Sequence, residues 1–194
     1  MKSEESADPV AEALSGAKMI ERLFDSRTIL IHGEINSTVA RMVTAQLLAL
    51  SSHSHDDINL YIQSEGGHVE SGDTIHDMIR FVKARVRMIG TGWVASSGVL
   101  IYMAAPKEDR FCLPNTRFLL HQPSGGVFGQ ASDIGIEAEE IVKMRERLNR
   151  IIADQTGQPI EKVTKDSERN FWMSPAEAVE YGLVGKIISS VDEL

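Results

Sequence analysis

Short apolar segments alternate with stretches of helical periodicity along most of the chain. Strands are predicted at 28–33, 58–63, 87–91, 117–121 and 185–189. Between the first two, apolar residues recur at the 3.6-residue spacing of a helix: Val39, Met42, Val43, Leu47 and Leu50. Further helices are predicted around 75–82, 97–105, 132–156, 159–167 and 174–182. Strands that alternate with helices in this way predict an α/β fold with a largely parallel sheet.

The domain organisation follows from the same pattern. Residues 1–17 are small, polar and charged, and are predicted to form a flexible N-terminal arm. Residues 18–194 carry the alternating elements without an internal repeat or a low-complexity linker. We therefore expect one domain.

Composition narrows the class of protein. The chain has 20 Lys and Arg against 28 Asp and Glu, a net charge of −8, which argues against a nucleic-acid binder. Cys112 is the only cysteine, so a disulfide framework is excluded and a reducing compartment is favoured. No apolar run approaches the roughly 20 residues of a membrane span, and the acidic start is unlike a secretory signal. The expected location is cytoplasmic. No metal site is expected, because His53 and His55 have no third ligand nearby.

Chemistry-bearing residues follow three of the predicted strands. The pair Gly66-Gly67 follows the second strand, Ser96 and Ser97 follow the third, and His121 ends the fourth. In parallel sheets, ligands gather at the carboxyl ends of strands. Ser96 or Ser97 can be a helix N-cap or a nucleophile. His121 can be structural or a base, and the glycines can serve a turn or a phosphate.

Several segments in order resemble known motifs of one family. These are 92–98 (GWVASSG), 121–126 (HQPSGG), 64–67 (SEGG), 166–169 (DSER) and 177–183 (EAVEYGL). Together they resemble the ClpP serine-peptidase family, which forms the proteolytic part of the Clp ATP-dependent protease. The resemblance spans about 28–188 and implies a single-domain ClpP/crotonase-like fold with a protruding strand-helix handle over about 122–156.

The resemblance assigns roles by motif. Ser96 is expected to be the nucleophile and His121 its general base and later acid. The N–H groups of Gly67 and Ser97 are expected to form the oxyanion hole. An extended substrate is expected to pair with the backbone of Gly125, Gly126 and Val127.

Some positions depart from the family pattern. Asn170 stands where the family usually has the aspartate of the triad, so weak or conditional activity is expected, and Asp166 is an alternative third member. Glu65 replaces the usual proline of the glycine turn. Trp93 and Val94 are bulkier than usual and are expected to narrow or reshape the pocket for the residue before the scissile bond.

The resemblance also implies an assembly. Two seven-membered rings of one chain, or of this chain mixed with a paralogous subunit, are expected to stack into a tetradecamer. Glu168 and Arg169 resemble the family's ring-contact pair. A Clp-type AAA+ unfoldase is the expected partner and polypeptides are the expected substrates. The chain has no nucleotide-binding loop, so it needs no cofactor of its own and ATP is used by the partner. The alternatives are an inactive or regulatory ring subunit and, more remotely, a crotonase-fold acyl-CoA enzyme.

Overall fold

The computed structural model describes residues 9–126 and 128–194, and in 9–15 it describes the backbone only. A seven-stranded sheet has the order β1-β2-β3-β4-β7, and β5 and β6 extend it from the far end of β3. All pairs are parallel except β5 with β6. The strands are β1 (Thr28–His32), β2 (Ile58–Ser64), β3 (Val86–Ala95), β4 (Arg110–Cys112), β5 (Arg117–Leu120), β6 (Phe171–Met173) and β7 (Lys186–Ile187).

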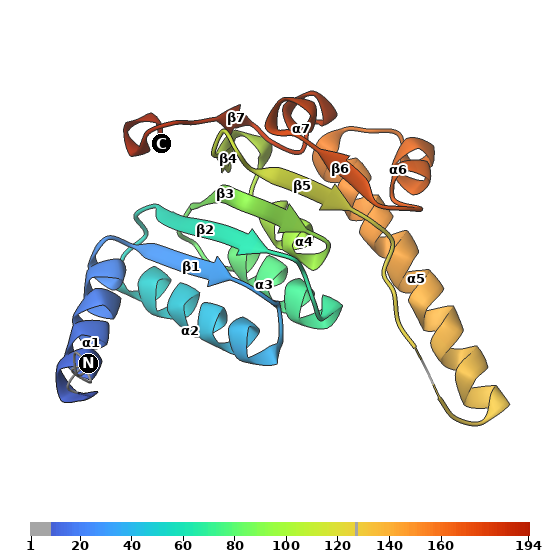
Figure 1. The fold of residues 1–194 in the computed structure, drawn as a ribbon, viewed down its shortest axis with the longest axis horizontal. Coiled ribbons are helices and arrows are strands. Elements are labelled where there is room, and N and C mark those ends of the chain that lie inside the picture. Colours follow the sequence, from blue (N-terminus) through green and yellow to red (C-terminus); the bar gives the residue numbers. More distant parts are fainter. Residues whose placement is uncertain (1–8, 127) are drawn as a thin grey trace, which may run out of the picture.

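Helices cover one face of this sheet, as Figure 1 shows for α2 and α3 beneath β1 and β2. The helices are α1 (Pro9–Asp25), α2 (Ser37–His53), α3 (Val69–Phe81), α4 (Ser97–Tyr102), α5 (Ala131–Thr156), α6 (Ile160–Asp166) and α7 (Pro175–Tyr181). The strand β2 shows why the layers form. Its residues alternate between buried and half-buried, and Ile58, Leu60 and Ile62 point into the core. The predicted α/β fold is confirmed.

The element boundaries differ from the prediction at several points. The helix α1 begins at Pro9, so residues 9–17 of the predicted arm are helical, while 1–8 lie outside the described residues. The helix after Ser96 ends at Tyr102 rather than near Ala105. The three-residue strands β4 and β6 were not predicted, because so few residues carry no periodicity.

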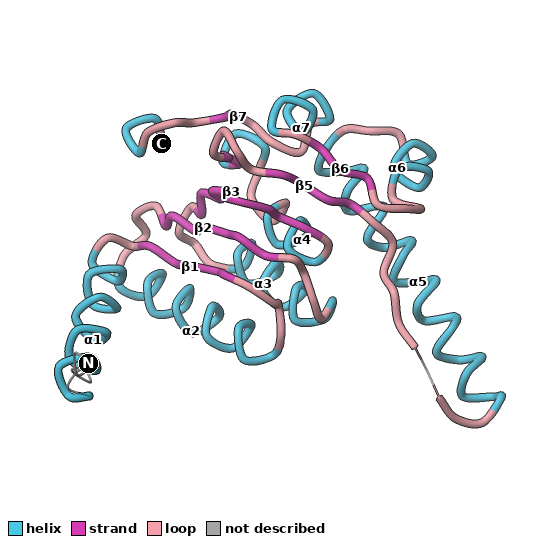
Figure 2. The backbone as a smooth tube through the Cα atoms, in the orientation of Figure 1, coloured by secondary structure: helices cyan, strands magenta, loops and turns pink. Residues whose placement is uncertain are grey.

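The predicted handle takes shape in α5. Its N-terminal half projects away from the body of the protein, as Figure 2 shows, and its residues 131–140 are all exposed. The handle contains no strand in its described residues, because the connection 121–130 is irregular, with 127 outside the description. None of the described helices combines the length and apolar character needed to span a membrane.

Two glycines that end helices provide a stability test. Gly157 ends α5 at φ 75° and Gly182 ends α7 at φ 87°. A Cβ on Gly157 would meet nothing within 4 Å, whereas a Cβ on Gly182 would lie 2.2 Å from the Thr156 carbonyl oxygen. We predict that Gly157→Ala lowers the free energy of unfolding by about 1 kcal/mol, the cost of a left-handed alanine. Gly182→Ala should cost about 2 kcal/mol more, because backbone must move. Denaturant titration of both variants measures the difference, and equal losses would contradict it.

Candidate active site

Ser96 lies at a strained turn between β3 and α4. Its φ of 56° and ψ of −126° belong to a region that residues other than glycine rarely adopt. The turn is held because the Ser96 N–H donates to the Leu119 carbonyl at 3.0 Å. The Ser96 side chain makes no capping hydrogen bond to α4. The structure therefore does not support the N-cap alternative for Ser96. Its hydroxyl has no partner among the described residues and lies at a turn of the kind that presents nucleophiles.

Ser97 is the first residue of α4 and is buried. As a first-turn residue, its backbone N–H has no acceptor within the helix. Its side-chain hydroxyl also has no hydrogen-bond partner among the described residues. Gly72 of α3 packs against it, since a Cβ there would lie 3.1 Å from Ser97 Cβ. The residue therefore contributes a backbone donor at the floor of the site.

The glycine turn after β2 lies directly against the serine turn. A Cβ on Gly66 would lie 2.5 Å from Ser96 Cβ, so only glycine fits there. Ser64 holds the turn, donating from its hydroxyl to the Gly33 carbonyl at 2.6 Å and accepting from Gly66 N–H at 3.0 Å.

Backbone pairing with Ile35 fixes the other side of this turn. Ile35 N–H donates to the Gly66 carbonyl, and His68 N–H donates to the Ile35 carbonyl, both at 2.8 Å. Among the described residues, the Gly67 N–H donates to no acceptor. Within the described residues, Gly67 and Ser97 thus each have an N–H without an acceptor, on the two turns that meet at Gly66 and Ser96, and an oxyanion hole needs two such donors.

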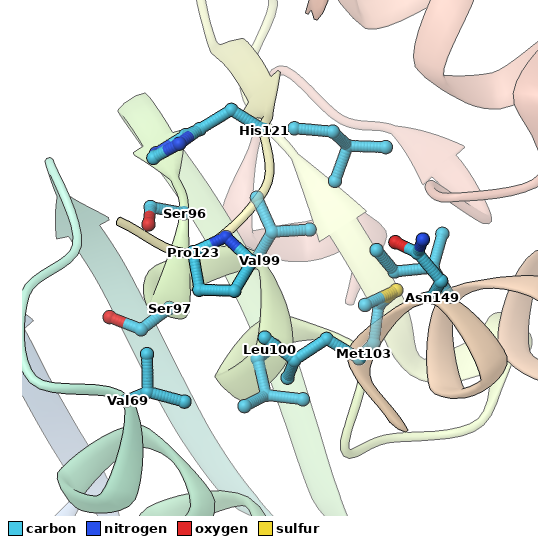
Figure 3. Close-up of a pocket in the computed structure, with 12 residues that line it drawn as sticks. Val69, Ser96, Ser97, Val99, Leu100, Met103, His121, Pro123 and Asn149 are labelled. Carbon is cyan, nitrogen blue, oxygen red and sulfur yellow. The ribbon is translucent and has the colours of Figure 1, made fainter. Parts of the chain in front are cut away.

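His121 follows β5, the strand that pairs in parallel with β3. The pair Ala95 and Leu119 ends this ladder, so Ser96 and His121 both lie just past its carboxyl end. Figure 3 shows the imidazole and the Ser96 hydroxyl at the same end of the pocket. The His121 Nδ1 hydrogen bonds to the Gln122 carbonyl at 2.8 Å. A carbonyl only accepts, so Nδ1 carries a proton here, and in the neutral ring Nε2 is free to accept one.

Asn170 enters the site through the register of β6. This strand pairs antiparallel with β5, with Leu120 opposite Phe171. One further step in the same register places Asn170 opposite His121. Asn170 is exposed, and in the described part of the chain no hydrogen bond joins it to His121 or His121 to Ser96. The structure brings the three residues to neighbouring strand ends without closing the bonds between them.

Asp166, the alternative third member, is occupied elsewhere. Its Oδ2 accepts from the Tyr181 hydroxyl at 3.1 Å and from Lys162 Nζ at 2.5 Å. The hydrogen bond and charge of Asp166 contribute, after burial, to a raised pKa of Tyr181. The structure therefore favours Asn170 over Asp166 as the neighbour of the imidazole.

A small pocket of about 40 Å³ opens beside Ser96 and His121. Most of its lining is apolar: Val69, Val99, Leu100, Met103, Leu120, Pro123, Leu148 and Ile152. Besides Ser96, Ser97 and His121, one further polar residue lines it: Asn149 on α5, which is buried and accepts from the Ser167 hydroxyl at 3.0 Å. The sequence analysis missed this wall, although Asn149 is visible as a polar residue within the apolar stripe of the long helix.

An ion pair fixes α5 as one wall of the pocket. Arg147 donates from both terminal nitrogens to the two oxygens of Asp73 on α3, at 2.8 and 2.6 Å. The hydrogen bond to Asp73 is the largest cause that raises the pKa of Arg147. A two-point contact of this kind fixes orientation as well as distance. The pair therefore joins α3 to α5 next to the pocket, whose lining includes the neighbouring Leu148.

The expectation that Trp93 and Val94 narrow the pocket is wrong. Val94 is fully buried in the core, and neither residue lines the pocket. The Trp93 ring instead stacks on Trp172, at 6.0 Å between centroids. Alternation along β3 explains this, because Trp93 and Val94 point to opposite faces of the sheet.

The remaining predicted residues lie around the pocket. Gly125 packs against α5, where its Cβ would lie 3.3 Å from Ile141, and Gly126 is in open space. Val127 lies outside the described residues. Glu168 and Arg169 are exposed on the connection between α6 and β6, and neither forms an ion pair within the described part of the chain. The Glu168 carbonyl accepts from the Gln122 amide at 2.9 Å, which joins this connection to the histidine segment.

Comparison with known proteins places this geometry in a family. The family model described as Clp protease matches residues 11–191. The ATP-dependent Clp protease proteolytic subunit 3 of Rhizobium etli is 58% identical over 190 residues, 98% of each chain. Proteolytic subunit 2 of Gluconobacter oxydans is 65% identical over 175 residues, 89% of this chain and 78% of that protein.

Solved structures agree with the sequence comparison. ClpP1 from Listeria monocytogenes is 55% identical and superposes with a TM-score of 0.83 over 91% of this chain and 99% of that chain. A mutant of the same protein, with an asparagine replaced by aspartate, gives 0.85 over 90% and 98%. The fold expected from the sequence motifs is confirmed, and the chain belongs to the Clp protease family.

Proposed function

We propose that the chain is the proteolytic subunit of a Clp-type ATP-dependent protease, a serine endopeptidase that cleaves unfolded polypeptides to short peptides. One observation carries the proposal above the others. Ser96 sits at a strained turn with a free hydroxyl, beside two unused backbone N–H groups and one strand away from His121. Acyl transfer needs a nucleophile, a base and an oxyanion hole, and these elements supply all three.

The chemistry assigns each residue a task. The His121 Nε2 takes the proton from the Ser96 hydroxyl as the oxygen attacks the peptide carbonyl. The N–H groups of Gly67 and Ser97 hold the negative oxygen of the tetrahedral intermediate. The imidazolium then gives its proton to the leaving amine, and water repeats the sequence to release the acyl group. The apolar pocket accepts a side chain of the substrate next to the scissile bond.

Backbone pairing accounts for broad substrate tolerance. Gly125, Gly126 and Val127 follow the histidine segment, and their backbone is proposed to pair with an extended substrate as an added strand. Main-chain groups are common to all peptides, so such pairing reads conformation rather than sequence. Only an unfolded segment offers an extended backbone, which fits delivery by a Clp-type AAA+ unfoldase. That partner, and not this chain, is proposed to use ATP in the cytoplasm.

Asn170 is proposed as the third catalytic residue and as the cause of conditional activity. Its amide oxygen can accept from the His121 Nδ1–H, which in the structure donates to the Gln122 carbonyl instead. An amide brings no negative charge to stabilise the imidazolium. In the free chain, the His121 Nδ1–H therefore bonds to the Gln122 carbonyl. Asn170, the neutral alternative acceptor, would lie opposite His121 one residue beyond the paired part of β6. The same features would suit a regulatory ring subunit, which is the alternative that the next experiment separates.

The first prediction concerns the reactivity of Ser96. A fluorophosphonate probe should label wild-type protein at Ser96, and Ser96→Ala should abolish the adduct. Asn170→Asp should raise the labelling rate at least about tenfold, because a carboxylate both orients and stabilises the imidazolium. Mass spectrometry of the adduct gives the site and its rate. Absence of an adduct in wild type, alone and mixed with any paralogous ring, would leave only the regulatory subunit.

A second prediction tests the contact between the two turns. Gly66→Ala should reduce the Ser96 labelling rate about a hundredfold, because the new methyl group must displace the Ser96 turn by about 1 Å. Gly33→Ala is the matched control, since Gly33 also has positive φ, of 81°, but has open space around its Cβ position. Gly33→Ala should lower the free energy of unfolding but leave the Ser96 labelling rate unchanged. Equal labelling of both variants would contradict the proposed geometry.

Assembly is proposed to follow the family pattern. The projecting half of α5 exposes Ile134, Ile136 and Val142, which suits a surface that packs on another copy of the chain. We propose that these residues join two seven-membered rings, and that Glu168 and Arg169 contribute to the ring contact. A closed barrel would keep an unselective peptidase away from folded proteins.

A third prediction follows for the particle mass. Wild type, alone or with a paralogue, should sediment with the mass of fourteen chains. Ile136→Asp should shift the mass to seven, because it places a charge in the buried contact. Glu137→Gln, on the neighbouring exposed position, should leave the particle intact. Analytical ultracentrifugation distinguishes the two, and a monomer in all cases would refute the proposed barrel.

A further inference from the structure

The only two tryptophans of the chain stack on each other at the open face of the sheet. Trp93 on β3 and Trp172 on β6 lie 6.0 Å apart between ring centroids, with 7° between their planes. The guanidinium of Arg117 on β5 lies 4.4 Å from the centroid of Trp172. Stacked aromatic pairs and arginine on an indole are both attractive contacts. Three strands thus contribute one member each to a single cluster, here called the Trp–Arg stack.

Topology gives this stack its significance. Strand β5 lies between β3 and β6, so Trp172 reaches over β5 to contact Trp93. Neighbouring strands in a sheet are about 4.8 Å apart, so the backbones of β3 and β6 are about 10 Å apart and the two side chains together bridge that distance. Strand β6 is three residues long and pairs with β5 alone. So short an edge strand has few backbone bonds to hold its register, and side-chain contacts must hold it.

Each strand that contributes to the Trp–Arg stack is directly followed or preceded in the chain by one residue of the candidate site. Trp93 precedes Ser96 on β3, Arg117 precedes His121 on β5, and Trp172 follows Asn170 on β6. Along the chain, Trp93 is three residues from Ser96, Arg117 is four residues from His121, and Trp172 is two residues from Asn170. A shift of β6 along β5 would move Asn170 away from its place opposite His121.

We propose that Trp172 is a positioning residue for peptide hydrolysis: by stacking on Trp93 and Arg117 it fixes the register of β6 and thereby holds Asn170 opposite His121. The inference rests on the proposed peptidase function and adds a residue that does not touch the substrate. It also explains why the bulky Trp93 is compatible with an open pocket, because its partner is Trp172 on the other face of the sheet.

The test is a double-mutant cycle on full-length, assembled protein. Trp172→Leu removes both ring contacts and should lower the Ser96 labelling rate and kcat for a peptide about tenfold, with KM unchanged. Trp172→Phe keeps an aromatic face and should retain most of the rate. In an Asn170→Ala background, Trp172→Leu should cause no further loss, because Trp172 acts through Asn170. An equal loss in both backgrounds would show a merely structural role and overturn the inference.

Two further measurements separate this inference from the proposed function. Phe81→Leu, which removes an exposed aromatic ring from the end of α3, is the control and should change neither rate. The exciton signal of the stacked indoles in circular dichroism should vanish in Trp172→Leu and persist in Phe81→Leu. If wild-type Ser96 never reacts, the proposed function fails. The positioning role is then decided by hydrogen exchange: faster exchange at 170–173 in Trp172→Leu supports it, and unchanged exchange overturns it.

Discussion

The close approach of the glycine turn after β2 to the serine turn after β3 is the contact on which the site depends. Gly66 leaves so little room that a Cβ would lie 2.5 Å from that of Ser96. Gly67 and Ser97 are each next in the chain to one of the two residues that touch, Gly66 and Ser96. The strain at Ser96 is therefore sustained by the core on both sides, and not by the turn alone. The parallel sheet supplies the rest, since it delivers the ends of β2, β3 and β5 to the same edge.

The sheet is covered unequally, and this asymmetry separates chemistry from support. Helices α2, α3 and α4 fill one face with apolar side chains, and the pocket forms between α3, α4 and α5. The other face carries the Trp–Arg stack and the half-buried side chain of Tyr61. Alternation along each strand lets one segment serve both faces: Val94 packs the core while Trp93 reaches β6.

Periodicity predicted much of the fold, and its failures have physical causes. Strands β1 and β2 and helix α5 were predicted within a residue or two, because their apolar residues repeat over several positions. Strand β4 was not predicted because it is three residues long and contains Arg110, a buried arginine whose pKa is lowered by burial. Strand β6 was not predicted because its two adjacent aromatic residues point to opposite faces of the sheet: Phe171 packs against the core and Trp172 joins the Trp–Arg stack.

Some features of the candidate site could also be predicted from the sequence, and others could not. Ser96, Gly67 and Ser97 could be placed from the sequence, because local turns and a helix start define them. His121 could be placed at a strand end, but its bond to the Gln122 carbonyl could not be predicted. That bond depends on the rotamer of His121 and on the backbone direction at Gln122, which the sequence pattern does not specify. Resemblance alone nominated Asn170, and the register of β6 explains why it lies where it does.

The segments that carry His121 and Asn170 are continuous with exposed parts of the protein surface. The connection 121–130 carries His121 and leads into the projecting half of α5, and the Gln122 amide ties it to the Glu168 carbonyl beside Asn170. In the proposed assembly, a partner copy that fixes α5 or the segment 168–170 would act on His121 and Asn170, which no hydrogen bond joins within the described part of the chain. With Asn170 as the proposed third catalytic residue this dependence would be stronger, because a neutral amide offers the imidazole no opposite charge. Under the proposed function, assembly is the step that aligns the site and confines activity to the barrel it creates.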